Sequence, residues 1–336
     1  MPLTKDMQLI EELLAGNRRA LARTITLVEN DGPESRNALA SLYGHTGRAH
    51  IVGVTGAPGT GKSTLVNALT KAYRHRGFTV GIVAVDPTSP FTGGALLGDR
   101  VRMRDLSGDA GIFIRSMATR GSLGGLAQAT AGVILTLDAA GFNRIIVETV
   151  GVGQAEVDIA STAHTTIVIE APGLGDEVQA IKAGVLEIAD ILAVNKADRD
   201  GVEKTVMALQ MMLGMGLRQT SHHGQTMEIQ EGITASPAWT PPILKTVALR
   251  DEGVDQLLQA IEGHRDYLHA SGEFQRREEE RARNALVHIL QAAVLRRLTN
   301  QVPARQIQDV VAQVASRDLD PYTAAERLLP AVLAGN

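Results

Sequence analysis

Eight residues near the start of the chain restrict the possible folds more than any other segment. They are Gly56, Ala57, Pro58, Gly59, Thr60, Gly61, Lys62 and Ser63. An apolar run, 51–54, precedes them and a helical pattern begins at Thr64, which is the setting that a phosphate-binding loop requires. The glycines let backbone N–H groups converge on an anion at the start of that helix. The alternative, a glycine-rich turn that binds nothing, is disfavoured by these flanking patterns. The segment Gly56 to Thr64 therefore predicts a nucleoside triphosphate site, with Lys62 on the β- and γ-phosphates and the Ser63 hydroxyl on Mg²⁺.

The composition excludes several classes of protein. The chain has 336 residues, enough for one large domain or two, and 44% of them are hydrophobic. A net charge of −4 and an aromatic content of 3% give no reason to expect a nucleic-acid partner. The chain has no cysteine, which excludes disulfides and cysteine-bound metal and favours a reducing compartment. We see no secretory signal and no apolar run long enough to cross a membrane, so we expect a cytoplasmic protein without a membrane partner.

Apolar strand patterns alternate with helical patterns through most of the chain. The expected strands cover 50–55, 79–85, 111–115, 144–149, 165–170, 190–195 and 242–249. Strands this apolar, separated by helices, predict an α/β fold of the P-loop NTPase class, with a mostly parallel central sheet flanked by helices. We divide the chain into an N-terminal helical segment (1–46), the P-loop domain (47–270) and a C-terminal helical arm (271–336).

Three features outside the expected strands receive structural interpretations. Helical spacing is expected over 5–28, with a weak point at Gly16, and over 98–107. Met207, Met211, Met212 and Met215 continue a helix that begins near Val202, and methionines at this spacing are expected to pack in the core. His222 and the adjacent His223 lack metal-ligand spacing, so we expect no metal there.

A second motif, Asn195-Lys196-Ala197-Asp198, follows an apolar strand directly. The Asp198 carboxylate can accept two hydrogen bonds from guanine, whereas adenine offers no such pair of donors. The Lys196 stem can lie across the base, and Asn195 can tie this loop to the phosphate loop. Alone, the tetrapeptide could equally place Asp198 as the cap of the next helix. Together with the phosphate loop it predicts a guanine site.

Carboxylates end two other expected strands, where an open parallel sheet places its ligands. Glu148 could hold Mg²⁺ directly or through water, and the Gly151 N–H could contact the γ-phosphate. Asp86 and Asp99 are two more candidate metal ligands, although a turn before Pro87 and a helix N-cap would explain them as well. Not all of these carboxylates can bind one octahedral ion directly. Gln154 fits two roles equally, orienting the attacking water or lying exposed in a loop.

Five segments together resemble a known family, the P-loop GTPases that serve adenosylcobalamin-dependent acyl-CoA mutases. The family includes the MeaB/ArgK proteins and the human methylmalonic aciduria type A protein. The segments are GAPGTGKST, DPTSPFTGGALLGDRVRM, ETVGVGQAEVD, APGLGDEVQAIKAGVLEIADI and NKAD. The resemblance covers roughly residues 1 to 270, and the C-terminal arm in outline.

The resemblance implies a GTPase that binds GTP, GDP and Mg²⁺, turns over slowly and gates adenosylcobalamin loading into a client mutase, protecting and reactivating it. The client would be methylmalonyl-CoA mutase or a related isobutyryl- or 2-hydroxyisobutyryl-CoA mutase. The implied catalytic residues are Lys62, Glu148 and Gln154. Asp176, Gln179 and Lys182 fall in a segment that responds to the client, and the C-terminal arm would form a homodimer.

One departure from the family pattern concerns the guanine-binding turn, Val247-Ala248-Leu249, which lacks the usual serine. Only a backbone N–H of Ala248 or Leu249 could then reach the guanine oxygen. Two other functions stay open. A metal-insertion GTPase would need a Cys/His entry motif, and a binding module would hold its nucleotide without turning it over.

Overall fold

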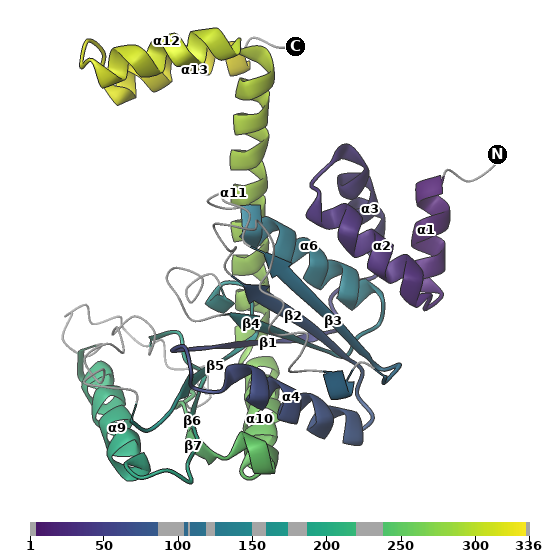
Figure 1. Cartoon of the computed structure of the whole chain (residues 1–336), viewed down its shortest axis with the longest axis vertical. Helices are drawn as coiled ribbons and strands as arrows, with labels where there is room; N and C mark the ends of the chain where they lie inside the picture. The colour runs from purple at the N-terminus through teal and green to yellow at the C-terminus, as the bar shows by residue number, and fades with distance from the viewer. Residues whose placement is uncertain are drawn as a thin grey trace, which may run out of the picture. The chain divides into compact units, whose positions relative to one another are not determined.

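The computed structural model describes residues 5–86, 104–106, 108–118, 125–149, 159–173, 187–219 and 238–333. Its centre is a seven-stranded sheet in the order β3-β2-β4-β1-β5-β6-β7, and every neighbouring pair is parallel (Figure 1). The expected α/β fold with a parallel sheet is confirmed. All strands therefore end at one edge, the carboxyl edge, and begin at the opposite one, the amino edge.

The strands are short, and those inside the sheet are almost wholly buried, as their apolar sequences require. They are β1 (His50–Gly56), β2 (Val80–Asp86), β3 (Ile112–Ala118), β4 (Arg144–Thr149), β5 (Thr165–Glu170), β6 (Ile191–Asn195) and β7 (Ile243–Thr246). The central strand β1 pairs with β4 on one side and β5 on the other. The phosphate loop follows β1, so it lies at the middle of the carboxyl edge.

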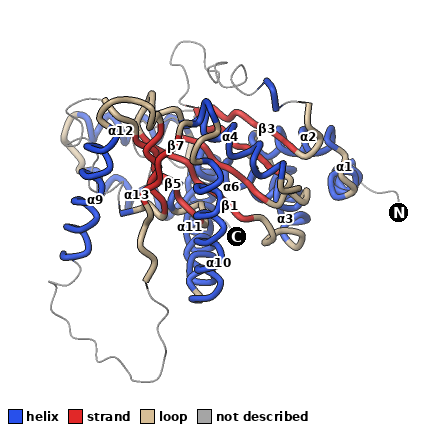
Figure 2. The backbone as a smooth tube through the Cα atoms, turned by 90° about the horizontal axis from the view of Figure 1, so that it is seen from below, coloured by secondary structure: helices blue, strands red, loops and turns tan. Residues whose placement is uncertain are grey.

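Helices cover both faces of this sheet (Figure 2). One face packs against α4 (Lys62–His75) and α10 (Val254–Ser271), where Val52 and Val54 of β1 contact a layer of leucines and isoleucines. The other face packs against α6 (Gly125–Ala139), and Ile51 belongs to that second layer. Because successive strand residues point to opposite faces, one apolar strand serves both layers. The burial of both faces explains why these strands show no alternation of apolar and polar residues.

Three N-terminal helices pack behind α6: α1 (Lys5–Leu14), α2 (Arg18–Glu29) and α3 (Pro33–Tyr43). The expected weak point at Gly16 is a true break, with a φ of +85° that favours glycine. Asn17 then caps α2, and its side-chain oxygen accepts from the N–H groups of Arg19 and Ala20 at 2.9 and 3.2 Å. One expected helical stretch is thus two helices.

Two expectations for the region after β6 need correction. The expected strand 242–249 ends at Thr246, and 248–250 form the 3-10 turn η2 (Ala248–Arg250). The strand stops there because the Ala248 N–H donates to the side chain of Asn195. In α9 (Val202–Gln219), Met207 and Met211 are more than half exposed, so the expectation that they pack in the core is wrong. Met212 is partly buried and packs against the core as expected, and the Met215 side chain lies outside the described residues.

The remaining chain is helical: α11 (Glu273–Gln301), α12 (Ala304–Ala315) and α13 (Pro321–Leu333). The chain divides into two compact units, Met1–Glu280 and Arg281–Asn336. The expected helix over 98–107 lies mostly outside the described residues, and its described part is the 3-10 turn η1 (Arg104–Leu106). Among the helices that the structure describes, none combines the length and the apolar content needed to cross a membrane.

Candidate nucleotide site

The phosphate loop turns sharply at the end of β1, and two of its glycines are required by their surroundings. Gly56 has a φ of +141°, and a Cβ there would lie 2.1 Å from the carbonyl oxygen of Ile169 in β5. Gly61 has a φ of +94°, and a Cβ would lie 2.5 Å from Asn195 Nδ2. Real Cβ atoms do not approach so closely, so any other residue would separate the loop from β5 or from β6.

Lys62 begins α4 and turns its side chain back over the loop. Its Nζ donates to the carbonyl oxygens of Gly56 at 2.8 Å and Ala57 at 3.0 Å, and the residue is buried. Thr60 closes the same turn by donating to the Ala57 carbonyl at 2.9 Å, while Pro58 lies exposed at the tip. The geometry thus holds an ammonium group inside the loop, at the start of a helix whose N–H groups favour an anion.

A buried serine–carboxylate pair lies beside the loop. The Ser63 hydroxyl donates to Glu148 Oε1 at 2.6 Å, and both residues are buried. Glu148 lies near the end of β4, in register with Val54 of β1 and Ala84 of β2. These are hard oxygen donors of the kind that Mg²⁺ takes. The backbone of Asp86 ends β2 at the same edge.

Asn195 joins three segments that are far apart in the sequence, and we call it the Asn195 junction. Its Nδ2 donates to the Thr60 carbonyl in the phosphate loop at 2.8 Å. Its Oδ1 accepts from the Thr246 hydroxyl at 3.2 Å and from the Ala248 N–H at 3.1 Å. The next residue, Lys196, has a φ of +58° and donates to the Gly59 carbonyl at 2.6 Å. The NKAD loop is therefore attached to the phosphate loop by two side chains.

Asp198 lies at the surface beyond this junction. Its Oδ2 is 3.3 Å from a guanidinium nitrogen of Arg250, the last residue of η2. Leu249 is 87% exposed on the same turn. The sequence interpretation missed two residues here, Arg250 and Thr246. Arg250 could have been found, because it follows the Val-Ala-Leu turn directly, whereas nothing in the sequence singles out Thr246.

One further contact anchors the segment that returns to the sheet after the Asp86 motif. Asp105 in η1 contacts Lys71 of α4 at 2.6 Å and accepts from Asn67 Nδ2 at 2.9 Å. These two partners, Lys71 first, lower the pKa of the Asp105 carboxyl. The helix that begins with the phosphate-loop lysine therefore also holds this returning segment in place.

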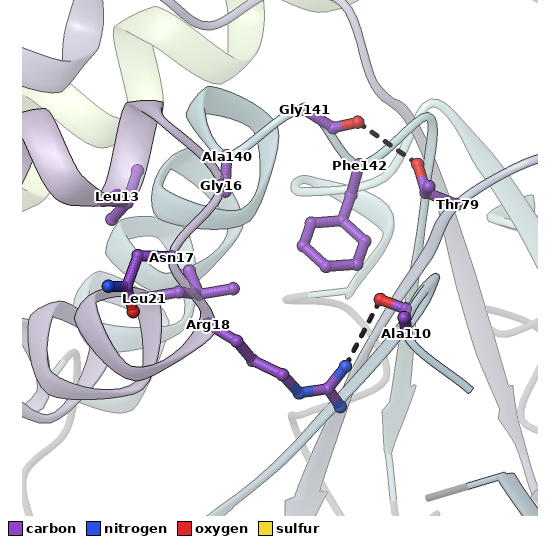
Figure 3. A pocket seen from close by; sticks show the side chains of 10 residues that line it. All are labelled: Leu13, Gly16, Asn17, Arg18, Leu21, Thr79, Ala110, Ala140, Gly141 and Phe142. Carbon is purple, nitrogen blue, oxygen red and sulfur yellow. Dashed lines mark hydrogen bonds between the residues drawn. The ribbon is translucent and has the colours of Figure 1, made fainter. Parts of the chain in front are cut away.

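Several predicted site residues lie outside the described residues: Asp99, Gly151, Gln154, Asp176, Gln179 and Lys182. The same holds for His222 and His223, where we expect no metal. A cavity of about 150 Å³ occurs elsewhere, between the N-terminal helices and the 141–142 turn (Figure 3). Leu13, Leu21 and Phe142 line it, and Arg18 crosses it to reach the Ala110 carbonyl. None of its lining residues belongs to the predicted nucleotide site.

A second polar cluster lies at the amino edge of the sheet. The amino-edge cluster comprises His50, His164, Thr165, Asp190, His264, Arg277 and Glu278. Arg277 donates to both carboxylate oxygens of Asp190, at 2.9 and 2.8 Å. His264 Nε2 lies 3.3 Å from the same carboxylate. Burial raises the pKa of Asp190, but the hydrogen bonds from His264 and Arg277 outweigh it and leave that pKa below its usual value.

The Thr165 hydroxyl joins two buried histidines of this cluster, because its oxygen lies 2.8 Å from His264 Nδ1 and 2.9 Å from His50 Nε2. The other ring nitrogen of His50, Nδ1, is buried and has no hydrogen-bond partner among the described residues. Burial first, and then the charges of His164 and Arg144, hold the pKa of His50 well below 6.5.

The strand order, the phosphate loop and the NKAD loop joined to it define a class, the P-loop GTPases. A family model described as "Methylmalonyl Co-A mutase-associated GTPase MeaB" matches residues 21–303. The chain belongs to this MeaB family and is therefore a GTPase, an enzyme that binds and hydrolyses guanine nucleotide.

Individual relatives agree with this assignment. A protein of Pyrococcus abyssi is 45% identical over 328 residues, which cover 98% of this chain and 97% of the relative. The GTPase ArgK of Escherichia coli is 34% identical over 324 residues, covering 95% and 94% of the two chains. The crystal structure of an LAO/AO transport system kinase superposes with a TM-score of 0.67 at 28% identity, over 98% of this chain and 97% of that one.

Proposed function

We propose that this GTPase is a chaperone of an adenosylcobalamin-dependent acyl-CoA mutase, and that its nucleotide state gates cofactor loading and protects and reactivates the enzyme. The support is the family description, which names association with methylmalonyl Co-A mutase and matches most of the chain. Methylmalonyl-CoA mutase is the first client to test, followed by isobutyryl- and 2-hydroxyisobutyryl-CoA mutases.

The chemistry that we propose is the in-line attack of water on the γ-phosphate of GTP. Lys62 would exchange its two carbonyl acceptors for the β- and γ-phosphate oxygens, and the loop N–H groups from Gly56 to Thr64 would hold the phosphates. Ser63 and Glu148 would hold Mg²⁺, which neutralises phosphate charge when bound. Asp86 and Asp99 are further candidates for its carboxylate ligands, directly or through water. Gln154 would orient the water.

The base site that we propose is carried by a single observation, the Asn195 junction. Because Asn195 bonds the phosphate loop and the η2 turn at once, a nucleotide in the loop would present its base to Asp198. The Ala248 N–H is already bonded to Asn195 Oδ1, which favours the Leu249 N–H as the donor to the guanine oxygen. Lys196 would cover the base, and Gly151 would contact the γ-phosphate.

We further propose a homodimer formed through the C-terminal arm, residues 271–336. Six large apolar side chains of α11 are 45% to 62% exposed: Leu286, Val287, Ile289, Leu290, Val294 and Leu295. A helix with such a stripe normally buries it against another helix, and a second copy of the chain would supply one. Asp176, Gln179 and Lys182 would respond to the docked mutase.

The experiment that tests this function measures GTP hydrolysis by the purified protein, alone and with each mutase. We expect slow basal turnover and strong stimulation by one mutase, with Mg²⁺ required. The Lys62→Ala variant should lose about 100- to 1,000-fold in turnover, because one preorganised cation is removed from the developing charge. Lys71→Ala, on the same helix but paired with Asp105, is the matched control. Basal turnover without stimulation by any mutase would reject the chaperone role and leave the GTPase intact.

A further inference from the structure

Arg250 contacts the carboxylate that we propose as the guanine reader. One guanidinium nitrogen lies 3.3 Å from Asp198 Oδ2, and another lies 3.9 Å from Glu252 Oε1. The backbone holds Arg250 at this place. Its N–H donates to the Val247 carbonyl at 2.9 Å, and the N–H of Ala248, two residues earlier, donates to Asn195 Oδ1. The arginine is therefore part of the turn that borders the base site.

The effect of this contact depends on how many hydrogen-bond donors each base presents to Asp198. Guanine presents two donors on one edge, the N1–H and the 2-amino group, which match the two oxygens of the Asp198 carboxylate. Hypoxanthine, the base of inosine nucleotides, has the N1–H but lacks the 2-amino group. If Asp198 acted alone, bound hypoxanthine would leave one carboxylate oxygen without a donor. The unpaired oxygen would weaken the binding of hypoxanthine relative to guanine. Arg250 supplies a donor to one oxygen whichever base is bound.

We propose that Arg250 is a specificity-determining residue that reduces the discrimination of this site against inosine nucleotides. This proposal rests on the proposed recognition of guanine by Asp198. When hypoxanthine occupies the site, its N1–H satisfies one oxygen of Asp198 and Arg250 satisfies the other. When guanine occupies it, all three donors fit, because a carboxylate has about four acceptor positions. Arg250 thus narrows the difference in affinity between the two bases.

The size of the effect follows from the exposure of the pair. The side chains of Arg250 and Asp198 are 60% and 36% exposed, and an ion pair in water contributes little. We therefore expect Arg250 to change the ratio of the two affinities by roughly two- to fivefold. The contribution should also weaken at high ionic strength, since surface charges are screened.

The test compares dissociation constants for GDP and IDP, measured by titration calorimetry on the full chain without turnover. Arg250→Gln should raise the ratio Kd(IDP)/Kd(GDP) by roughly two- to fivefold, while Arg250→Lys, which keeps a cation, should stay nearer the parent. Added salt should raise the ratio in the parent chain and leave it unchanged in Arg250→Gln. Arg76→Gln is the matched control, because Arg76 forms an exposed 3.3 Å pair with Asp255 and should not alter the ratio.

Two outcomes separate this inference from the proposed base site. If Arg250→Gln leaves the ratio unchanged while Asp198→Asn changes base preference, Asp198 reads the base and the role of Arg250 is refuted. If Asp198→Asn leaves base preference unchanged, the proposed base site fails, and the Arg250 inference fails with it. Thermal melts of each variant show that an altered ratio does not come from loss of folding.

Discussion

The two edges of the same sheet carry polar side chains in opposite ways. At the carboxyl edge, Lys62 bonds backbone carbonyls of its own loop, and Asp198 bonds an exposed arginine. At the amino edge, Asp190 is held by both nitrogens of Arg277 and by His264, all enclosed by α10 and the first turns of α11. Lys62 can exchange its carbonyl acceptors for those of a ligand, and Asp198 keeps acceptor positions for a base beside Arg250, whereas the carboxylate oxygens of Asp190 are already held by Arg277 and His264.

Comparing the ion pairs of Asp198 and Asp190 shows how the exposure of a pair separates an exchangeable contact from a structural one. Both edges combine carboxylates, cations and hydroxyls, so the types of residue do not distinguish them. What differs is the cost of breaking each contact. An exposed pair contributes up to about 1 kcal/mol, whereas breaking a buried pair costs about 3–5 kcal/mol. A ligand can displace contacts of the first kind without unfolding the chain.

The largest expected effect is a change of base preference at the carboxyl edge. Asp198→Asn should weaken GTP binding and strengthen xanthosine triphosphate binding, because an amide can donate to the extra carbonyl of xanthine. We expect the preference to shift by about 100-fold or more, measured as the ratio of the two dissociation constants. Asp200→Asn, an exposed carboxylate two residues further on, is the control. A variant that still prefers GTP would show that another group reads the base.

The next effect is a loss of stability at the amino edge without a loss of nucleotide binding. Asp190→Asn removes the negative charge and one of the two acceptor oxygens that hold the largely buried Arg277, and should cost about 3 kcal/mol in the free energy of unfolding. Asp255→Asn, from an exposed pair, should cost less than about 1 kcal/mol. Urea unfolding measures both, and calorimetry with GDP measures binding. Equal losses in the two variants would contradict the contrast between the edges.

A smaller effect is the pH dependence that His50 confers. In the unfolded chain His50 takes up a proton below about pH 6.5, whereas the buried folded form stays neutral to a lower pH. The unfolded state therefore binds more protons in this window, and stability falls as the pH drops from 6.5 toward the folded-state pKa. The slope is at most about 1.4 kcal/mol per pH unit for one group.

This pH dependence can be tested with one variant and one control. His50→Gln should flatten the dependence of the unfolding free energy between pH 7 and 5, after correction for its lower overall stability. His45→Gln, in the exposed turn after α3, should keep the parental slope. The same slope in the parent and in His50→Gln would assign the pH dependence to another group.

The sequence predicted the carboxyl edge far better than the amino edge, and the reason is physical. The phosphate loop and NKAD are local motifs, because a ligand imposes fixed spacings on consecutive residues. The Asp190–Arg277 and His50–Thr165 contacts join residues 87 and 115 positions apart in the chain, and burial imposes no spacing on them. Such a cluster appears only once the strands and α11 are placed.

The predictions that were partly wrong also failed because of contacts between residues far apart in the chain. The expected strand 242–249 and the buried methionines of α9 follow from apolar pattern alone. The pattern cannot show that Asn195 takes the Ala248 N–H, or that only part of α9 contacts the sheet. The ion pair of Arg250 and Asp198 was missed although Arg250 directly follows the Val-Ala-Leu turn, because an arginine after a turn is also typical of a solvated surface.

The Asn195 junction has a consequence for how the occupied and empty states can be observed. One amide group fastens the phosphate loop to the turn after β7, so the exchange of the Ala248 amide hydrogen with solvent reports on both. An isotopic label on the Ala248 amide would report the binding of a phosphate group without any modification of the nucleotide. We therefore expect the turn to respond to the occupancy of a loop that precedes it by almost two hundred residues.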